Sequence, residues 1–169
     1  MLPNGTAYNA SVDVADADRF DFFDIGALGE RIPQEAGDIQ LIGNCSPCLY
    51  NESGISSIAF ARGNYTIVYT APLRDYHLQI PFEHPYSVTI SLPQEFDAKN
   101  PLLAGISPGG VIIEGGNNTT MVQWNRTMSV DLRFYDKNRE ALFYLFGNFW
   151  VVIAIVLLVP FLITVRRKE

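Results

Sequence analysis

The chain has few of the side chains that carry most enzyme chemistry. Among its 169 residues are two cysteines and two histidines. It contains no Gly-x-Ser-x-Gly elbow, phosphate-binding glycine loop, HExxH motif or dinucleotide-binding fingerprint. We therefore predict no catalytic residue, no metal site and no cofactor, and we expect a protein that is not an enzyme.

Basic residues are also scarce before the C-terminal end. Residues 1–141 contain nine Lys or Arg and seventeen Asp or Glu, which gives a formal charge of −8. A surface this acidic repels nucleic-acid phosphates, and the sequence has no basic stripe that would offset the repulsion. We therefore exclude nucleic acid as a partner.

The first residues lack the features of a secretory signal. Met1 to Gly5 include neither a basic n-region nor an apolar h-region. Two explanations remain open. Either a signal peptide was removed before residue 1, or the C-terminal apolar run drives insertion, as in a tail-anchored cytosolic protein. We favour the first.

One long run without ionisable side chains lies near the C-terminus, from Phe143 to Val165. As an α-helix it would reach roughly 34 Å, enough to cross a hydrocarbon core of roughly 30 Å. We predict a single transmembrane helix at 143–165, preceded by a juxtamembrane linker at 137–142 and followed by a cytoplasmic tail at 166–169.

The flanks of this run indicate its orientation. The positive-inside rule places the basic residues that follow it in the cytoplasm, and Lys137 and Arg139 on the other flank weaken this bias. The outer third of the run is rich in aromatic side chains, as is typical of a membrane interface. The predicted interface residues are Phe143, Tyr144, Phe146, Phe149, Trp150, Arg166, Arg167 and Lys168.

Asn-x-Ser/Thr triplets favour an extracellular N-terminal domain. Eight are present, where about one is expected by chance, and all precede the apolar run. Asn44 is a poor acceptor because Pro47 follows its Ser, and adjacent Asn residues are not expected to be modified together. The alternative is that polar turns simply collect these residue types. The candidate glycosylation sites are Asn4, Asn9, Asn51, Asn64, Asn117, Asn118 and Asn125.

The two cysteines, Cys45 and Cys48, form a CxxC pair. Such a pair can be a redox dithiol, half of a zinc site or a disulfide that closes a turn. Zinc is disfavoured because His77 and His84, seven residues apart, are the only candidates for the remaining ligands. A thioredoxin-type dithiol is disfavoured because it belongs at the start of a helix, whereas the residues after Cys48 have a loop composition. In an oxidising compartment we expect a structural disulfide. A redox role of the pair is one alternative, and a nucleophile–base pair of either cysteine with His77 is another.

Residues 1–35 hold five Asp between Asp13 and Asp24, with Arg19 the only base among them. A calcium loop is disfavoured because the segment lacks the acid spacing and the glycine of an EF-hand. We expect an acidic N-terminal segment that is either a solvated edge strand or a lead-in to the sheet.

Residues 36–136 have the pattern of a β domain. β-branched and aromatic runs alternate with Gly and Pro. The pattern predicts an antiparallel β-sandwich of seven or eight strands, in which Val130, Leu132 and Phe134 face inward. The predicted strands are 38–42, 55–60, 65–70, 77–80, 86–92, 111–114, 119–124 and 129–135, with turns at 62–64 and 107–110.

Several of these segments resemble a known family. They are GNYTIVYTAPL (63–73), SVTISLP (87–93), NPLLAGISPGG (100–110) and VQWNRTMSVDLRFYD (122–136), together with the aromatic-led apolar run. The sequence is similar to an uncharacterised archaeal family of small surface proteins with a C-terminal membrane anchor, a domain of unknown function. The resemblance implies an exported, anchored archaeal protein and supplies no functional residues. The chain departs from lipoprotein-like relatives because no Leu-x-Gly-Cys box precedes Cys45.

These features predict a single-pass protein of the cell membrane with an extracellular β domain. Its predicted role is that of a cell-surface structural or binding module, with the lipid bilayer and other membrane or envelope proteins as partners. One alternative is an extracytoplasmic thiol–disulfide protein that uses Cys45 and Cys48. Another is an accessory subunit of a membrane complex, docked through the anchor, where the amide of Asn148 can bind a partner helix.

Overall fold

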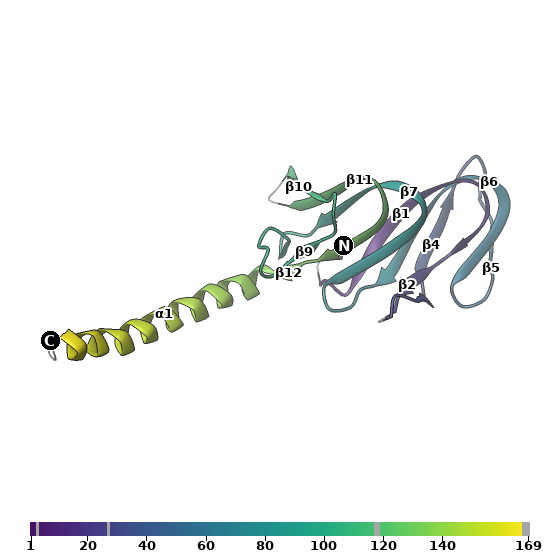
Figure 1. Ribbon diagram of the computed structural model, residues 1–169. Helices are drawn as coiled ribbons and strands as arrows, with labels where there is room; N and C mark the ends of the chain where they lie inside the picture. Colours follow the sequence, from purple (N-terminus) through teal and green to yellow (C-terminus); the bar gives the residue numbers. More distant parts are fainter. Residues whose placement is uncertain (3, 27, 117–118, 167–169) are drawn as a thin grey trace.

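The computed structural model describes residues 1–2, 4–26, 28–116 and 119–166, the last seven by their backbone alone. These residues form antiparallel sheets and one C-terminal α-helix, so the predicted mainly β class is confirmed (Figure 1). The elements are β1 (Ala7–Asp21), β2 (Phe23–Ile25), β3 (Arg31–Pro33), β4 (Gly37–Ile42), β5 (Tyr50–Glu52), β6 (Ser57–Pro72), β7 (His77–Leu92), β8 (Phe96–Asp97), β9 (Gly105–Ile106), β10 (Val111–Glu114), β11 (Thr120–Arg133), β12 (Tyr135–Asp136) and α1 (Lys137–Arg166).

Three strands are longer than the sequence pattern predicts. β6 runs through the predicted turn at 62–64, and β11 joins the two strands predicted at 119–124 and 129–135. β7 continues through Pro81 and Pro85, which it tolerates because it is an edge strand of its sheet. The predicted turn and strand ends are therefore wrong at these points. The Gly and Pro residues there lie within continuous strands.

Two local predictions are confirmed. β10 pairs with the start of β11 as a hairpin, with Val111 opposite Gln123 and Glu114 opposite Thr120. The turn before it is closed by a hydrogen bond from the Gly110 main-chain N–H to the Ser107 carbonyl at 3.2 Å. Gly109 has a φ of +86° in this turn, a conformation that glycine adopts without a steric penalty.

The two four-stranded sheets repeat one connection pattern. Each contains a long outer strand, β1 or β7, that pairs along most of a long central strand, β6 or β11. Between these long strands in the chain come two short ones on the other edge of the central strand. The first, β4 or β9, pairs with its C-terminal half, and the second, β5 or β10, with its N-terminal half. We call residues 7–72 the first unit and residues 77–133 the second unit.

The long ribbon of the first unit is folded over at its middle. The register of β1 against β6 shifts between Val14 and Arg19, and Asp16 within this stretch has a φ of 51°. An irregularity of this kind bends a strand and increases its twist. As a result, the ring of Phe22 just after β1 lies 4.9 Å from that of Tyr69, which pairs near the start of β1.

The ribbon of the second unit is folded in the same way. Register shifts occur on both sides of Thr127, and Arg126 has a φ of 53°. The bend brings the start of β11 and the strand that follows its end, β12, together at Asp97. The Thr120 hydroxyl donates to Asp97 Oδ1 at 3.0 Å, while Tyr135 pairs with Asp97 in the β8–β12 ladder.

Both units contribute to one hydrophobic core. Ile58 and Ile67 from the first unit are 1 % and 0 % exposed, and Trp124 from the second unit is 0 % exposed. The predicted inward face of the last long strand is confirmed, because Val130, Leu132 and Phe134 are all buried. Each β unit therefore depends on the other for the burial of its apolar face.

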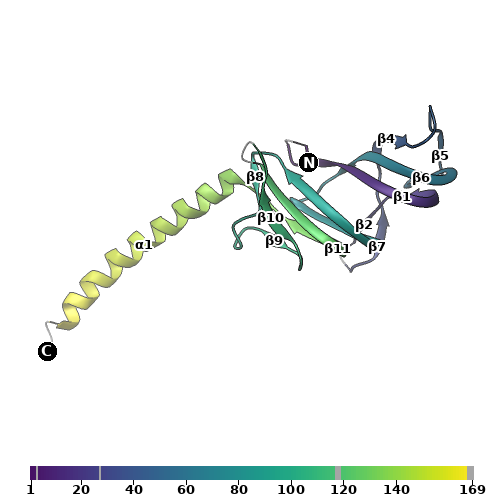
Figure 2. The same cartoon turned by 90° about the horizontal axis from the view of Figure 1, so that it is seen from above.

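Helix α1 extends away from the β domain beyond the second unit (Figures 1 and 2). It begins at Lys137, so residues 137–142 belong to the same helix rather than to a separate linker. Nearly all of its described apolar side chains are exposed. Within the described part of the chain, α1 is the single helix long and apolar enough to span a membrane.

Candidate functional site

The start of α1 is held by the second unit through its main chain and its charged side chains. Asp136 caps the helix, since its Oδ1 accepts the main-chain N–H of Asn138 at 2.7 Å. The N–H of Lys137 donates to the carbonyl of Glu95 at 3.0 Å, and its Nζ donates to the carbonyl of Gln94 at 2.5 Å. The first turn therefore has partners on the loop between β7 and β8.

Glu140 joins the first turn of α1 to two other segments. Its carboxylate accepts hydrogen bonds from Asn100 Nδ2 at 3.1 Å and from the Tyr135 hydroxyl at 3.3 Å. The Tyr135 oxygen also accepts the main-chain N–H of Asn100 at 3.2 Å. Burial, together with the nearby carboxylates of Asp97 and Glu140, raises the pKa of Tyr135 to about 12. The phenol is thus neutral and available as a donor near neutral pH.

A third contact comes from Arg139. Its guanidinium lies over the ring of Tyr76, 5.2 Å from the ring centroid. Tyr76 packs against Phe96 and Phe134, with ring centroids 5.5 and 5.7 Å away. The contacts of the first turn therefore extend into the core. We call the residues of the β domain that receive this turn the helix socket: Tyr76, Gln94, Glu95, Asn100 and Tyr135.

The helix socket is not among the predicted sites, because residues 137–142 are predicted to form a linker. A signal was present. Asp136 is a favoured N-cap residue, and Glu140 places negative charge in the first turn, where the helix dipole favours it.

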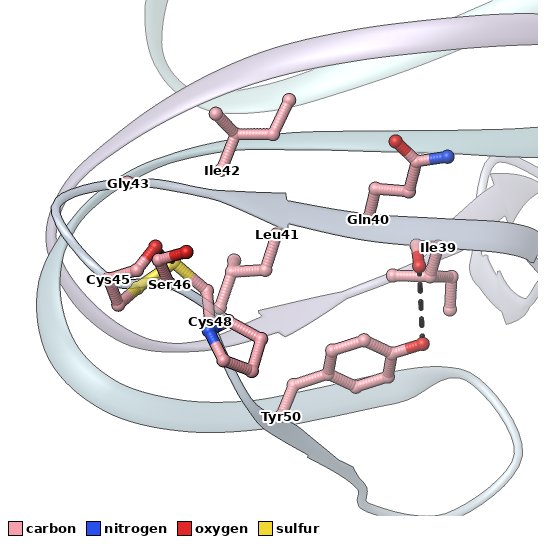
Figure 3. Close-up of a pocket in the computed structure, with 10 residues that line it drawn as sticks. Ile39, Gln40, Leu41, Ile42, Gly43, Cys45, Ser46, Cys48 and Tyr50 are labelled. Atoms are coloured by element: carbon pink, nitrogen blue, oxygen red, sulfur yellow. Dashed lines mark hydrogen bonds between the residues drawn. A yellow bond between two sulfur atoms is a disulfide. The ribbon is translucent and has the colours of Figure 1, made fainter.

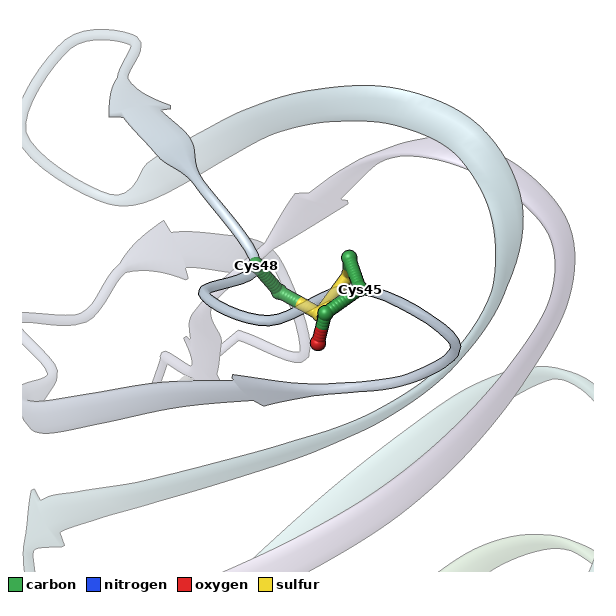
Figure 4. Close-up of a disulfide and its surroundings, with 2 residues drawn as sticks. All are labelled: Cys45 and Cys48. Carbon is green, nitrogen blue, oxygen red and sulfur yellow. A yellow bond between two sulfur atoms is a disulfide. The ribbon is translucent and has the colours of Figure 1, made fainter.

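Cys45 and Cys48 form a disulfide in the loop between β4 and β5, as predicted (Figure 4). In redox-active CxxC proteins the nucleophilic thiol is activated at a helix N-terminus or beside a positive charge. Here the pair lies in the loop between β4 and β5, two short strands that both pair with β6. The local fold therefore supplies a constraint on a loop and no helix dipole that would lower a thiol pKa.

A shallow groove of about 370 Å³ runs beside the disulfide, at the end of β4 (Figure 3). Ile39, Leu41 and Tyr50 form its apolar wall, and the Tyr50 hydroxyl donates to the carbonyl of Ile39 at 3.2 Å. Its ten lining residues include no acidic, basic or histidine side chain. The groove can make apolar contacts, and the Tyr50 phenol, which is bonded to Ile39, is the ionisable side chain in its lining.

His77 lies in the second unit and is bonded to a carboxylate. Its Nε2 is 2.9 Å from Asp131 Oδ1, and Gln79 Nε2 donates to Asp131 Oδ2 at 2.7 Å. Partial burial opposes ionisation of Asp131, but these hydrogen bonds outweigh it and the pKa of Asp131 is lowered. The cysteine–histidine pair considered from the sequence is not assembled, because both sulfurs are in the disulfide and His77 is bonded to Asp131.

No group of three His, Cys, Asp or Glu side chains that could hold a metal ion occurs in the described ranges. The five Asp residues predicted to form an acidic segment are placed on or next to β1 and β2. Asp13 accepts a hydrogen bond from Thr66 and Asp16 pairs with Arg62, so two of these carboxylates have partners on β6.

The family of the chain is shown by its match to a family model. Residues 49–169 match a family of unknown function (DUF5803). The chain belongs to this family. The predicted family resemblance is confirmed, while an archaeal origin stays a prediction. Comparison with curated proteins gave no match, and comparison with solved structures gave none either.

The DUF5803 match begins just after Cys48. It covers β5, β6, the whole second unit, the helix socket and α1, whereas β1 to β4 and the disulfide precede it. The match therefore lends no support to a redox role for the family. The matched residues include the whole second unit and its junction with the helix.

The predicted glycosylation sites of this DUF5803 chain are exposed wherever the structure describes them. Asn4, Asn9, Asn51, Asn64 and Asn125 are all exposed, whereas Asn117 and Asn118 lie outside the described residues. The Oδ1 atom of Asn64 accepts the main-chain N–H of Asp16 at 2.8 Å. Because the amide oxygen is bonded to Asp16, the amide nitrogen, which would carry a glycan, points away from the Asp16 N–H. Modification of these residues stays a prediction.

The predicted interface aromatics lie on the first four turns of α1. Phe143, Tyr144, Phe146, Phe149 and Trp150 are between 44 % and 61 % exposed. They follow the charged residues of the first turn, so the polar-to-aromatic boundary lies within one turn of the helix socket. Of the predicted basic residues, Arg166 is described by its backbone, and Arg167 and Lys168 lie outside the described residues.

Proposed function

We propose that the protein is a non-enzymatic extracellular β module, anchored to the cell membrane by α1 and acting as a cell-surface structural or binding component. One observation supports the proposal: the β domain, which contains a disulfide, continues directly into an exposed apolar helix. The exposed helix surface requires lipid to cover it. The disulfide is typical of an oxidising compartment outside the cytosol.

Cysteine labelling of intact cells tests the orientation. Ile55, 82 % exposed in the loop between β5 and β6, is changed to Cys in one variant, and a cysteine is appended after Glu169 in another. A membrane-impermeant maleimide should label Ile55→Cys on intact cells and the appended cysteine only after permeabilisation. The opposite pattern would establish a tail-anchored protein whose domain faces the cytosol. The unmodified chain, whose two cysteines are in the disulfide, is the control.

A thiol–disulfide function is the second candidate. It is favoured by the exposed position of Cys45 beside an open groove that a partner can reach. A redox protein should show a labile disulfide and a depressed thiol pKa. A reduction potential near that of a structural disulfide, with an ordinary thiol pKa after reduction, would exclude it.

An accessory-subunit function is favoured by one exposed amide. Asn148 is exposed on α1, and amide side chains can hydrogen-bond between helices in a membrane. Crosslinking in the native membrane should capture a partner with the unchanged chain and less of it with Asn148→Leu. Equal capture by both would exclude a specific role for this amide.

A further inference from the structure

The turn at residues 100–103, which we call the lip, presents an exposed leucine beside the start of α1. Leu102 is 75 % exposed. Its main-chain N–H donates to Asn100 Oδ1 at 3.0 Å, and the Asn100 carbonyl accepts N–H groups from Leu103 and Ala104 at 3.1 and 2.9 Å. Three hydrogen bonds to one residue define the shape of the lip, so the exposure of Leu102 is built into the fold.

The lip is also bonded to the helix. Asn100 donates its side-chain amide to Glu140 on α1 and its main-chain N–H to the Tyr135 hydroxyl oxygen in the helix socket. The loop before β9 accordingly lies close to the start of α1 (Figure 1). These hydrogen bonds fix the position of the lip along the direction of the helix axis.

Distances along the chain allow Leu102 to reach the level of the aromatic residues. Phe143 is three residues beyond Glu140, or roughly 4.5 Å along the helix axis. Leu102 is two residues from Asn100, a separation that spans at most roughly 7 Å. The Leu102 side chain therefore lies within reach of the plane at which α1 becomes aromatic, which is where interfacial side chains sit in a bilayer.

Exposed apolar side chains also occur elsewhere on the β domain. Leu28, Leu49 and Ile55 of the first unit are 94 %, 78 % and 82 % exposed, and Val111 and Met128 of the second unit are 60 % and 52 % exposed. A single exposed leucine needs no explanation by itself. What distinguishes Leu102 is its hydrogen-bonded connection to the first turn of a membrane-spanning helix.

We propose that the lip is a lipid-contacting surface, with Leu102 inserted into the interfacial layer of the leaflet that α1 enters. The β domain then touches the bilayer at two places, the helix and the lip, and its tilt is restricted. This inference rests on the membrane anchoring of the proposed function and adds a surface whose ligand is the lipid interface.

Spin labelling of the full chain in phosphatidylcholine vesicles tests the lip. Nitroxides are attached to Leu102→Cys, to Ile55→Cys as a water-exposed control and to Ile155→Cys as a control within α1. Collision rates are measured with oxygen, which concentrates in lipid, and with a water-soluble nickel complex. We expect the nickel rate at 102 to be several-fold lower than at 55 and the oxygen rate to be higher. A further change, Asn100→Ala, should move the values at 102 towards those at 55.

The controls separate failure of the lip from failure of the anchor. If the label at 155 reports lipid while the label at 102 matches the one at 55, the lip proposal is wrong and the anchor stands. If the label at 155 is itself exposed to nickel, the anchor fails and the proposed function fails with it. The exposed Asn125→Ala change should leave the values at 102 unaltered, and an equal shift from both asparagine changes would also overturn the lip.

Discussion

The two units of the β domain share an order of strands and differ in their surfaces. Residues 7–72 carry nine acidic and three basic side chains, while residues 77–133 carry five and three. The second unit lies between the first unit and α1 (Figure 1). Acidic side chains are repelled by anionic lipid headgroups. The less charged unit thus supplies three of the five helix-socket residues, Gln94, Glu95 and Asn100, while the strongly acidic unit, with the disulfide, lies away from the helix.

One arrangement of strands is thus combined with two different surfaces. The shared part, a long folded ribbon with two short strands, builds a common core. The parts that differ, the charge, the disulfide loop and the helix socket, are at the surface or in connections. Changes to the core should therefore affect both units, and changes to the surfaces should affect one.

The largest effect is expected from truncating the core. Trp124→Ala in the second unit should lower the free energy of unfolding by about 3–5 kcal/mol, and Ile67→Ala in the first unit by about 2–5 kcal/mol, because both side chains are fully buried. Hydrogen exchange in detergent should show that either change accelerates opening of both units. Exposed Gln123→Ala is the matched control. Two separate unfolding transitions would contradict a common core.

Removal of the disulfide should have the next largest effect. For the short loop that Cys45 and Cys48 close, the chain-entropy relation gives a loss of about 2 kcal/mol on reduction. The loss should appear as a lower urea midpoint, and exchange should increase mainly in the first unit. The double variant Cys45→Ser/Cys48→Ser should not respond to reductant. Equal acceleration throughout the second unit would contradict the local effect.

A smaller effect should follow from Tyr135→Phe in the helix socket. The change removes a donor to Glu140 and an acceptor for the Asn100 N–H, at a cost of about 1 kcal/mol. Hydrogen exchange should increase at residues 100–104 and 137–140, while exchange in the first unit stays constant. Exposed Tyr144→Phe on α1 is the control.

The same variant has a distinct pH dependence. Burial raises the pKa of Tyr135 from 10.0 to about 12, so the neutral phenol is favoured in the folded state. Its contribution to stability is fully present below pH 10 and is lost as the pH rises towards 12. Denaturation between these pH values should show a smaller alkaline loss for Tyr135→Phe than for the unchanged chain. Identical profiles would show that this phenol is not coupled to folding.

The smallest effect is expected from surface ion pairs. Arg62 pairs with Asp16 in the first unit, and Lys99 pairs with Glu114 in the second, at 2.7 and 2.8 Å. Replacement of either base by Ala should change the free energy of unfolding only slightly, since exposed pairs contribute little. Because the first unit has the larger excess of acid, Arg62→Ala should show the stronger salt dependence. Equal salt dependence of the two variants would weaken the contrast between the units.

The features that could be predicted from the sequence depend on neighbouring residues. Periodicity gave the inward positions of Val130, Leu132 and Phe134, turn chemistry gave the hairpin before Trp124, and hydropathy gave α1. The CxxC spacing predicted the disulfide. Each of these signals lies within a few residues of the element that it describes.

The remaining features depend on residues far apart in the chain. Pairing of Ala7 with Pro72 and of His77 with Arg133 sets the two units, and no local pattern encodes it. Breaks in alternation near Gly63 resembled a turn, because a bend within a ladder uses the same residue types as a strand end. The helix socket joins Asn100 to Glu140, a contact across 40 residues that requires the fold to be known.

The continuous passage from β12 into α1 has a mechanical consequence. Where a flexible linker joins a domain to its anchor, a sideways pull on the domain is absorbed by rotation at the joint. Here the first helical turn is fixed by the N-cap at Asp136, by Lys137 and Arg139, and by Glu140. A force on the distal first unit is therefore transmitted as a torque to the helix, and under the membrane anchoring that we propose this torque would tilt α1 in the bilayer.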